Sequence, residues 1–352
     1  MQVMSAIAPD FAELRPLKSI STPGFPVYPG LAKRMMAANN HPDDCTAHVL
    51  ATCAGYAYAE EQTVAMMMAR LGLEKNRCLR VFLGVDAMFI SSTAYLVQSA
   101  DGSVVVLAYR GTEPTNFINW LTDADVNPER VRVPFPGAGG EFEIHGGFYR
   151  NVLATRVEVI EALKRALRGE SIVPGGAKVP GGGKVPGPLQ ALYITGHSLG
   201  GAMASLMGVM LVTEPAYEAI AATLRAVYTY GQPMIGEPRF AQACAAHSFL
   251  SQNVIRYVYR HDVVACLPPT ASGDFAHFGP ELRYADGGWK RSATPTRQMA
   301  NLLEIPGAVA AFAAHQIRWL RKLPFQRSIY DHMPRHYISA LKPPDVLSEF
   351  GD

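Results

Sequence analysis

The chain has 352 residues, of which 49% are hydrophobic and 18% are charged, and its formal net charge is +2. This composition provides enough apolar material for a large core and excludes disorder of the chain as a whole. The small net charge argues against nucleic acid as a partner, because phosphate binding requires a clear excess of basic residues.

The cysteines and the N-terminal residues narrow the class of protein further. The five cysteines are scattered without a C-x-x-C pair, which indicates free thiols and no zinc site. We expect no metal and no other cofactor. No basic segment precedes a long apolar run as in a signal peptide, and no stretch reaches the ~18–20 apolar residues of a membrane span. The cytoplasm is the default location, with signal-independent export as the alternative.

The first half of the chain contains helical and β-rich segments. Apolar residues recur at helical spacing over residues 43–71. Residues 92–98 and 103–109 are β-rich, and the Asp101-Gly102 turn between them is typical of a hairpin. An amphipathic helix is predicted over residues 148–167, where it ends in basic residues and a glycine.

Residues 173–188 form an imperfect V-P-G-G-x-K repeat. The repeat is too short for a solenoid, and its proline and glycine content predicts a mobile surface loop that does not pack.

The second half alternates strands and helices. Strands are predicted at residues 189–195, 224–230 and 253–259, each separated from the next by a helical segment. This alternation implies crossover connections, and therefore an α/β fold with a mostly parallel central sheet and helices on both faces. We expect a single domain over residues 1–352.

The C-terminal part is predicted to add a helical insertion or cap at about 287–330. A further strand is expected around Arg283, residues 296–323 have a helical pattern, and a final short helix covers residues 331–341.

The segment Gly196-His-Ser198-Leu-Gly200 joins a predicted strand to a predicted apolar helix. Glycines two positions before and after a serine permit a sharp turn that presents the hydroxyl at a helix N-terminus, where it can act as a nucleophile. The alternative is a tight turn in which Ser198 only caps the helix. The strand–turn–helix order favours the nucleophile.

A serine nucleophile requires a base, an acid that orients the base, and donors for the oxyanion. In doubly wound hydrolases the chain order is serine, acid, histidine. Asp262 follows a predicted strand and is the candidate acid, with an ordinary turn aspartate as the alternative. His332 and His336 compete as the base.

The oxyanion donors are expected from the backbone amide of Leu199 and from the loop after the strand at 103–109. Thr112 lies in that loop and offers an amide and a hydroxyl. An N-cap role for Thr112 is compatible with this interpretation.

Five motifs in this order resemble the class 3 lipase family of α/β-hydrolases, from about Asp43 to Leu341. They are Tyr109-Arg-Gly-Thr112 with Asn119-Trp120-Leu-Thr-Asp123, His145-Gly-Gly-Phe148, Gly196-His-Ser-Leu-Gly200-Gly201, Tyr230-Gly-Gln-Pro-Met-Ile-Gly236, and Arg256-Tyr-Val with Asp262 and Leu267-Pro-Pro269. The closing Asp331-His332 with Tyr337 agrees with the family's histidine segment.

The resemblance implies Ser198 as nucleophile, Asp262 as orienting acid and His332 as base, with Thr112 and Leu199 in the oxyanion hole. It favours His332 over His336 because the family usually places a tyrosine five residues after the histidine.

Members of the family often carry a movable helical lid after the oxyanion strand, here at about residues 114–122. Phe117 and Trp120 would offer apolar surface to substrate there, although a fixed surface helix is the alternative. A second segment, residues 299–323, combines apolar residues with a basic end. It could contact a lipid–water interface or cap the domain.

The sequence therefore predicts a serine ester hydrolase, in the first place a lipase that acts on acylglycerols through an acyl-enzyme. A phospholipase or another esterase of the same family is the alternative. A catalytically silent hydrolase-fold binding protein, or a peripheral membrane-binding protein that uses residues 299–323, would belong to a different class.

Overall fold

The computed structural model describes residues 5–7, 26–38, 43–85, 90–111, 128–135, 140–300, 329–344 and 346. Within these ranges one sheet contains nine strands in the order β1-β2-β3-β4-β7-β8-β9-β10-β11, and β5 and β6 pair separately. The strands are β1 (Ser5–Ile7), β2 (Arg77–Val85), β3 (Ile90–Gln98), β4 (Val104–Tyr109), β5 (Pro128–Arg132), β6 (Glu141–His145), β7 (Ala191–His197), β8 (Leu224–Tyr230), β9 (Val254–Tyr259), β10 (Glu281–Ala285) and β11 (Gly288–Arg291).

The centre of the sheet is parallel and its two edges are antiparallel. Strands β4, β7, β8, β9 and β10 are parallel neighbours, whereas β1 to β4 and the pair β10–β11 are antiparallel. Every residue of β4, β7 and β9 is buried, as expected for strands covered on both faces. The predicted mostly parallel sheet is confirmed.

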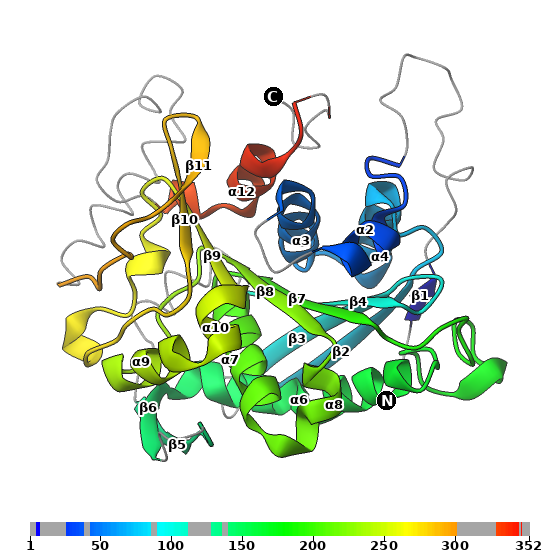
Figure 1. The fold of residues 1–352 in the computed structure, drawn as a ribbon, viewed down its shortest axis with the longest axis horizontal. Coiled ribbons are helices and arrows are strands. Elements are labelled where there is room, and N and C mark those ends of the chain that lie inside the picture. Colours follow the sequence, from blue (N-terminus) through cyan, green and yellow to red (C-terminus); the bar gives the residue numbers. More distant parts are fainter. Residues whose placement is uncertain are drawn as a thin grey trace.

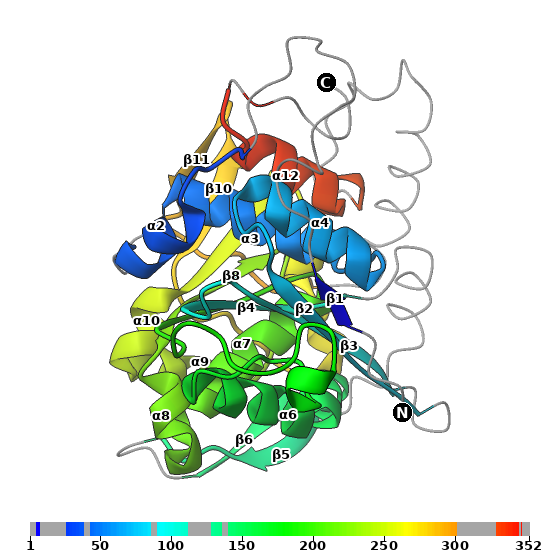
Figure 2. The ribbon, with the colours of Figure 1, turned by 90° about the vertical axis from the view of Figure 1, so that its right-hand side faces the viewer.

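Helices cover both faces of the sheet (Figures 1 and 2). Helices α2, α3, α4 and α12 lie on one face, and α6 to α10 lie on the other. The helices are α2 (Leu31–Ala37), α3 (Asp44–Tyr56), α4 (Glu61–Leu71), α6 (Gly146–Leu167), α7 (Leu199–Thr213), α8 (Glu218–Ala221), α9 (Pro238–Ala246), α10 (Ser248–Asn253) and α12 (Pro334–Leu341). Each layer packs its own apolar cluster against the sheet.

The helical segment predicted over residues 43–71 consists of two helices, α3 and α4. Asp43 caps the first, because its carboxylate accepts the Thr46 N–H at 2.9 Å. The chain turns after Tyr56, whose carbonyl accepts the Ala59 N–H at 2.8 Å. The apolar spacing continues across this turn, so the sequence pattern does not reveal the break between the two helices.

The Pro/Gly-rich segment 173–188 is packed, so the predicted absence of packing is wrong. Val173 and Val185 are buried. Backbone hydrogen bonds hold both ends of the segment, from Ser171 N to Gly183 O at 2.7 Å and from Gly187 N to Asp101 O at 2.8 Å. The valines of the repeat therefore anchor a loop whose composition alone predicts mobility.

The described part of the insertion predicted at 287–330 differs from the expectation. Residues 288–291 form β11, which pairs with β10, and residues 292–300 contain no helix. Residues 301–328 lie outside the described residues, as does most of the segment 299–323. The single domain over residues 1–352 stays a prediction.

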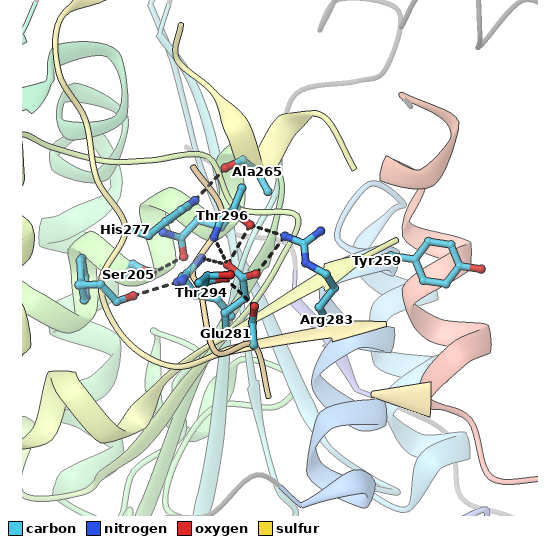
Figure 3. A network of polar contacts seen from close by, with 12 residues as sticks. Ser205, Tyr259, Ala265, His277, Glu281, Arg283, Thr294 and Thr296 are labelled. Atoms are coloured by element: carbon cyan, nitrogen blue, oxygen red, sulfur yellow. Dashed lines mark hydrogen bonds and ion pairs between the residues drawn. The ribbon is translucent and has the colours of Figure 1, made fainter. Parts of the chain in front are cut away.

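An ion-pair network around the buried Glu281 joins β9, β10 and a residue after β11 (Figure 3). The Glu281 carboxylate accepts from the Arg256 guanidinium at 3.2 Å and from the Arg283 guanidinium at 3.0 Å. Thr296 donates to the same carboxylate from its amide and its hydroxyl, both at 2.9 Å. His277 donates to the Ala265 carbonyl at 2.8 Å beside this group.

Within the described residues no single helix has the length and hydropathy to cross a membrane. Helix α7 together with residues 215–221 passes the same test only as a pair bent by 96°.

Candidate active site

Ser198 occupies the sharp turn between β7 and α7. Its backbone has φ 61° and ψ −132°, a region that is strained for a residue with a Cβ. The Ser198 N–H donates to the Tyr230 carbonyl at 2.9 Å, which ties the turn to the end of β8. Among the described residues, Ser198 Oγ is buried without a hydrogen-bond partner. The strained turn expected from the sequence is confirmed.

The glycines that flank Ser198 are required by close backbone contacts. A Cβ on Gly196 would overlap the Gly200 carbonyl oxygen in α7, and a Cβ on Gly200 would overlap the Tyr109 carbonyl oxygen in β4. No L side chain fits at either position without moving the backbone. The spacing of these glycines therefore follows from the turn itself.

Asp262 and His332 meet although they lie 70 residues apart. Asp262 follows β9, and His332 ends a 3₁₀ turn, Tyr330–His332, that precedes α12. His332 Nδ1 lies 2.8 Å from Asp262 Oδ2, and both side chains are buried. Because a carboxylate only accepts, Nδ1 carries the proton and Nε2 is the basic atom of the neutral ring.

His336 has a different environment from His332. Its ring stacks on Tyr259, with centroids 5.2 Å apart and planes 9° apart. The structure thus brings His332 to Asp262 and holds His336 against an aromatic surface.

Gly231 lies against the Asp262–His332 pair at the end of β8. Its φ is 59°, and a Cβ there would stand 2.7 Å from His332 Nδ1 and 2.5 Å from Asp262 Oδ2. The preceding residue, Tyr230, accepts the Ser198 N–H. The serine turn and the imidazole therefore approach the same end of β8.

The Asp262 carboxylate is stabilised in its charged form. Burial raises its pKa, but His332 and hydrogen bonds from His332, Tyr337 and Val264 outweigh burial and leave the pKa below its ordinary value. Val264 N–H donates to Oδ1 at 2.8 Å, and the Tyr337 hydroxyl donates to Oδ2 at 2.5 Å. An ionised Asp262 can stabilise a positive charge on His332.

The predicted oxyanion donors are only partly described. Leu199 begins α7, so its amide lies at the helix N-terminus beside Ser198. The loop after β4 approaches the same serine, because a Cβ on Gly111 would stand 3.2 Å from Ser198 Cβ. Thr112 follows Gly111 but lies outside the described residues, together with Phe117, Trp120 and the whole lid predicted at 114–122.

Three side chains around His332 have no assigned role in the sequence prediction. Tyr337 served only as a spacing marker, yet its hydroxyl binds Asp262 and accepts the Tyr259 N–H at 3.1 Å. His197 points away from Ser198, and its ring instead lies 4.4 Å from the His332 ring. Tyr58 binds His197 at 2.9 Å and stands in a turn between helices, where no sequence signal marks it.

Among the residues that the structure describes, no group of three or more histidine, cysteine, aspartate or glutamate side chains could hold a metal ion.

Sequence comparison relates this chain to known lipases. A model of the class 3 lipases matches residues 106–272. A lipase of Rhizomucor miehei is 24% identical over 59% of this chain and 49% of its own length. A triacylglycerol lipase of Arabidopsis thaliana is 32% identical over 53% of this chain and 38% of its own. The chain therefore spans less than half the length of these two relatives.

A further curated relative and two solved structures match more of their own length. The secreted mono- and diacylglycerol lipase A of Penicillium cyclopium is 24% identical over 65% of this chain and 66% of its own. Lipase II of Rhizopus niveus superposes with a TM-score of 0.54 at 20% identity, covering 82% of this chain and 92% of the other. A deletion mutant of Rhizomucor miehei lipase with its propeptide gives 0.51 at 18% identity over 93% and 96%. At these identities the structural match shows a shared fold.

Proposed function

We propose that this chain, which belongs to the class 3 lipase family and has the α/β-hydrolase fold, hydrolyses the esters of acylglycerols through an acyl-serine intermediate. One observation carries the proposal. The buried Asp262–His332 pair stands at the same end of β8 as the strained Ser198 turn. That arrangement suits general-base activation of a hydroxyl.

In the proposed reaction His332 Nε2 takes the Ser198 proton as Oγ attacks the ester carbonyl. Asp262 stabilises the positive imidazolium and accepts a hydrogen bond from its Nδ1–H. His332 then protonates the leaving alkoxide, and the acyl group stays on Ser198. A water molecule repeats the sequence, with His332 as its base, and releases the carboxylic acid.

The negative charge on the tetrahedral intermediate requires donors at the Ser198 turn. We assign the Leu199 amide to this role because it opens α7, and Thr112 because it follows Gly111 at the Ser198 side chain. Loss of one such donor costs about 10²–10³ in kcat for enzymes of this type.

The substrate class rests on the relatives, which are a triacylglycerol lipase and a mono- and diacylglycerol lipase. Phe117 and Trp120 are proposed to contact the acyl chain or to form a lid, and contact with a lipid–water interface belongs to the same proposal. Phospholipase or soluble-ester activity would appear as a different preference in the substrate test.

The test compares the wild type with Ser198→Ala on emulsified triacylglycerols, phospholipids and p-nitrophenyl esters of graded length. Ser198→Ala is expected to lower kcat by about 10⁴-fold or more while the fold persists. His332→Ala is expected to be inactive, and His336→Ala is expected to retain activity. A fluorophosphonate probe should label the wild type only at Ser198. A folded wild type that neither labels nor hydrolyses any ester would overturn the proposal in favour of a silent scaffold.

A further inference from the structure

His197 is the residue between Gly196 and Ser198, and its side chain faces the base instead of the nucleophile. It is 3% exposed. Its Nε2 lies 2.6 Å from the backbone carbonyl oxygen of His332, and its Nδ1 lies 2.9 Å from the Tyr58 hydroxyl. One buried ring thus connects the serine turn to the backbone of His332.

These two contacts determine which nitrogen of His197 carries its proton. A carbonyl oxygen only accepts, so Nε2 must donate to His332. In the neutral ring Nδ1 then has a lone pair, and the Tyr58 hydroxyl donates to it. The His332 carbonyl therefore selects this tautomer of His197, and the Tyr58 hydroxyl stabilises it by donating to Nδ1.

The charge state of His197 supports the same arrangement. Burial, and after it the neighbouring His332, lowers the pKa of His197 from 6.5 to about 3. The ionisable groups that face it are Tyr58, His332, Asp262 and Tyr337, whose ring meets the His197 ring edge to face at 5.8 Å. A neutral ring beside His332 adds no repulsion when His332 gains a proton.

We propose that His197 is a positioning residue, which holds the backbone and the ring plane of His332 in line with Ser198 while the Tyr58 hydroxyl holds the His197 ring in place. This role rests on the proposed ester hydrolysis. The tilted contact between the His197 and His332 rings, with planes 33° apart, limits rotation of the His332 ring, and the hydrogen bond from His197 limits movement of the His332 backbone. Because His197 is covalently next to Ser198, the nucleophile and the base share one support.

The chain contains a matched pair for comparison. Tyr28 and His48 form the same hydroxyl–Nδ1 contact at 3.0 Å, with ring centroids 5.9 Å apart and planes 70° apart. The rings of Tyr58 and His197 are 5.9 Å and 68° apart. His48 lies on α3, in the helical layer, and is buried like His197. Only the Tyr58–His197 pair connects to His332.

The main test compares His197→Leu, His197→Gln and His48→Leu for ester hydrolysis. His197→Leu is expected to lower kcat about 10- to 100-fold with little change in KM, since small displacements of a reacting group cost rate more than binding. His197→Gln should recover most of this loss, because the amide nitrogen of glutamine reaches about as far as Nε2. His48→Leu should lower the melting temperature and leave kcat unchanged.

A second comparison removes one oxygen from each pair and covers the case in which His197→Leu does not fold. Tyr58→Phe is expected to lower kcat about threefold to tenfold, whereas Tyr28→Phe leaves it unchanged. Equal kcat values for Tyr58→Phe and Tyr28→Phe would overturn the proposal. So would a folded His197→Leu with the kcat of the wild type.

A spectroscopic measurement separates this inference from the proposed function. The proton between His332 Nδ1 and Asp262 should give a low-field NMR signal in the wild type. Tyr58→Phe should shift or broaden that signal, and Tyr28→Phe should not. This result does not require substrate, so it tests the positioning role even if the wild type proves inactive on esters. An unchanged signal in Tyr58→Phe would contradict the role.

Discussion

Asp262 and Glu281 are both buried carboxylates paired with a nitrogen cation or base, yet their surroundings suit opposite tasks. Glu281 is surrounded by the guanidinium groups of Arg256 and Arg283 and by two donors of Thr296. Asp262 is paired with the imidazole of His332 and accepts hydrogen bonds from the uncharged Tyr337 hydroxyl and the Val264 amide. A guanidinium keeps its proton at all working pH values, whereas an imidazole exchanges it near neutrality.

The difference lies in what each partner can do after the pair has formed. In both cases burial raises the carboxyl pKa and the neighbouring groups bring it below its ordinary value. At Glu281 the result is a permanently ionised link between β9 and β10. At Asp262 the result is a fixed negative charge beside a base that can accept a proton. The first arrangement links two strands, and the second suits the proton transfer that we propose.

The largest expected effect in this comparison is that of Asp262→Asn on the rate of ester hydrolysis. The amide would donate to His332 Nδ1 and favour the wrong tautomer, so kcat should fall by about 10⁴-fold. Urea unfolding of the variant provides the control for a folded state. A loss of less than tenfold in a folded variant would contradict the assignment of Asp262 as the orienting acid.

Glu281→Gln should affect stability instead of rate. It leaves the Arg256 guanidinium, which is 2% exposed, without a counter-charge, at a cost of about 3–5 kcal/mol in the free energy of unfolding. Activity per folded molecule should stay at the wild-type value. The double variant Arg256→Met with Glu281→Leu, which removes both charges, should lose less stability than Glu281→Gln. The comparison fails if Glu281→Gln folds as stably as the wild type but hydrolyses esters more slowly.

The smallest expected effect, counted per pH unit, is a pH dependence of stability that both regions share. His197 beside His332 and His277 beside Arg256 are buried, and burial first, then the neighbouring charge, lowers each pKa from 6.5 to about 3. The unfolded chain binds protons at these residues below pH 6.5 while the fold does not, so stability falls as pH drops from about 6.5 toward 3. The slope is about 1.4 kcal/mol per pH unit for each histidine at most.

Urea unfolding at several pH values measures this slope. His277→Leu should reduce the slope of the unfolding free energy against pH by the contribution of one histidine. The pH profile of kcat should not change. A slope that is the same in His277→Leu as in the wild type would show that His277 is protonated equally in both states.

Much of the site could be predicted because its signals are local. Gly196, Ser198 and Gly200 lie within five residues, and the turn they form depends only on backbone sterics. Asp262 follows a strand whose apolar run is visible in the sequence. In contrast, the contacts of Tyr58 and Glu281 join segments whose separation along the chain leaves no periodic pattern.

The sequence by itself determined the strand and helix alternation and the candidate nucleophile, since both follow from short-range spacing and backbone geometry. Only the tertiary structure showed which of His332 and His336, four residues apart, lies at Asp262, because that distance depends on how α12 packs against α3 and β9. It also showed that the Pro/Gly-rich segment packs, since Val173 joins the apolar cluster of one helical layer and Val185 lies beside Gly102. Local sterics can be predicted from neighbouring residues, but a contact between distant segments exists only once the sheet has brought them together.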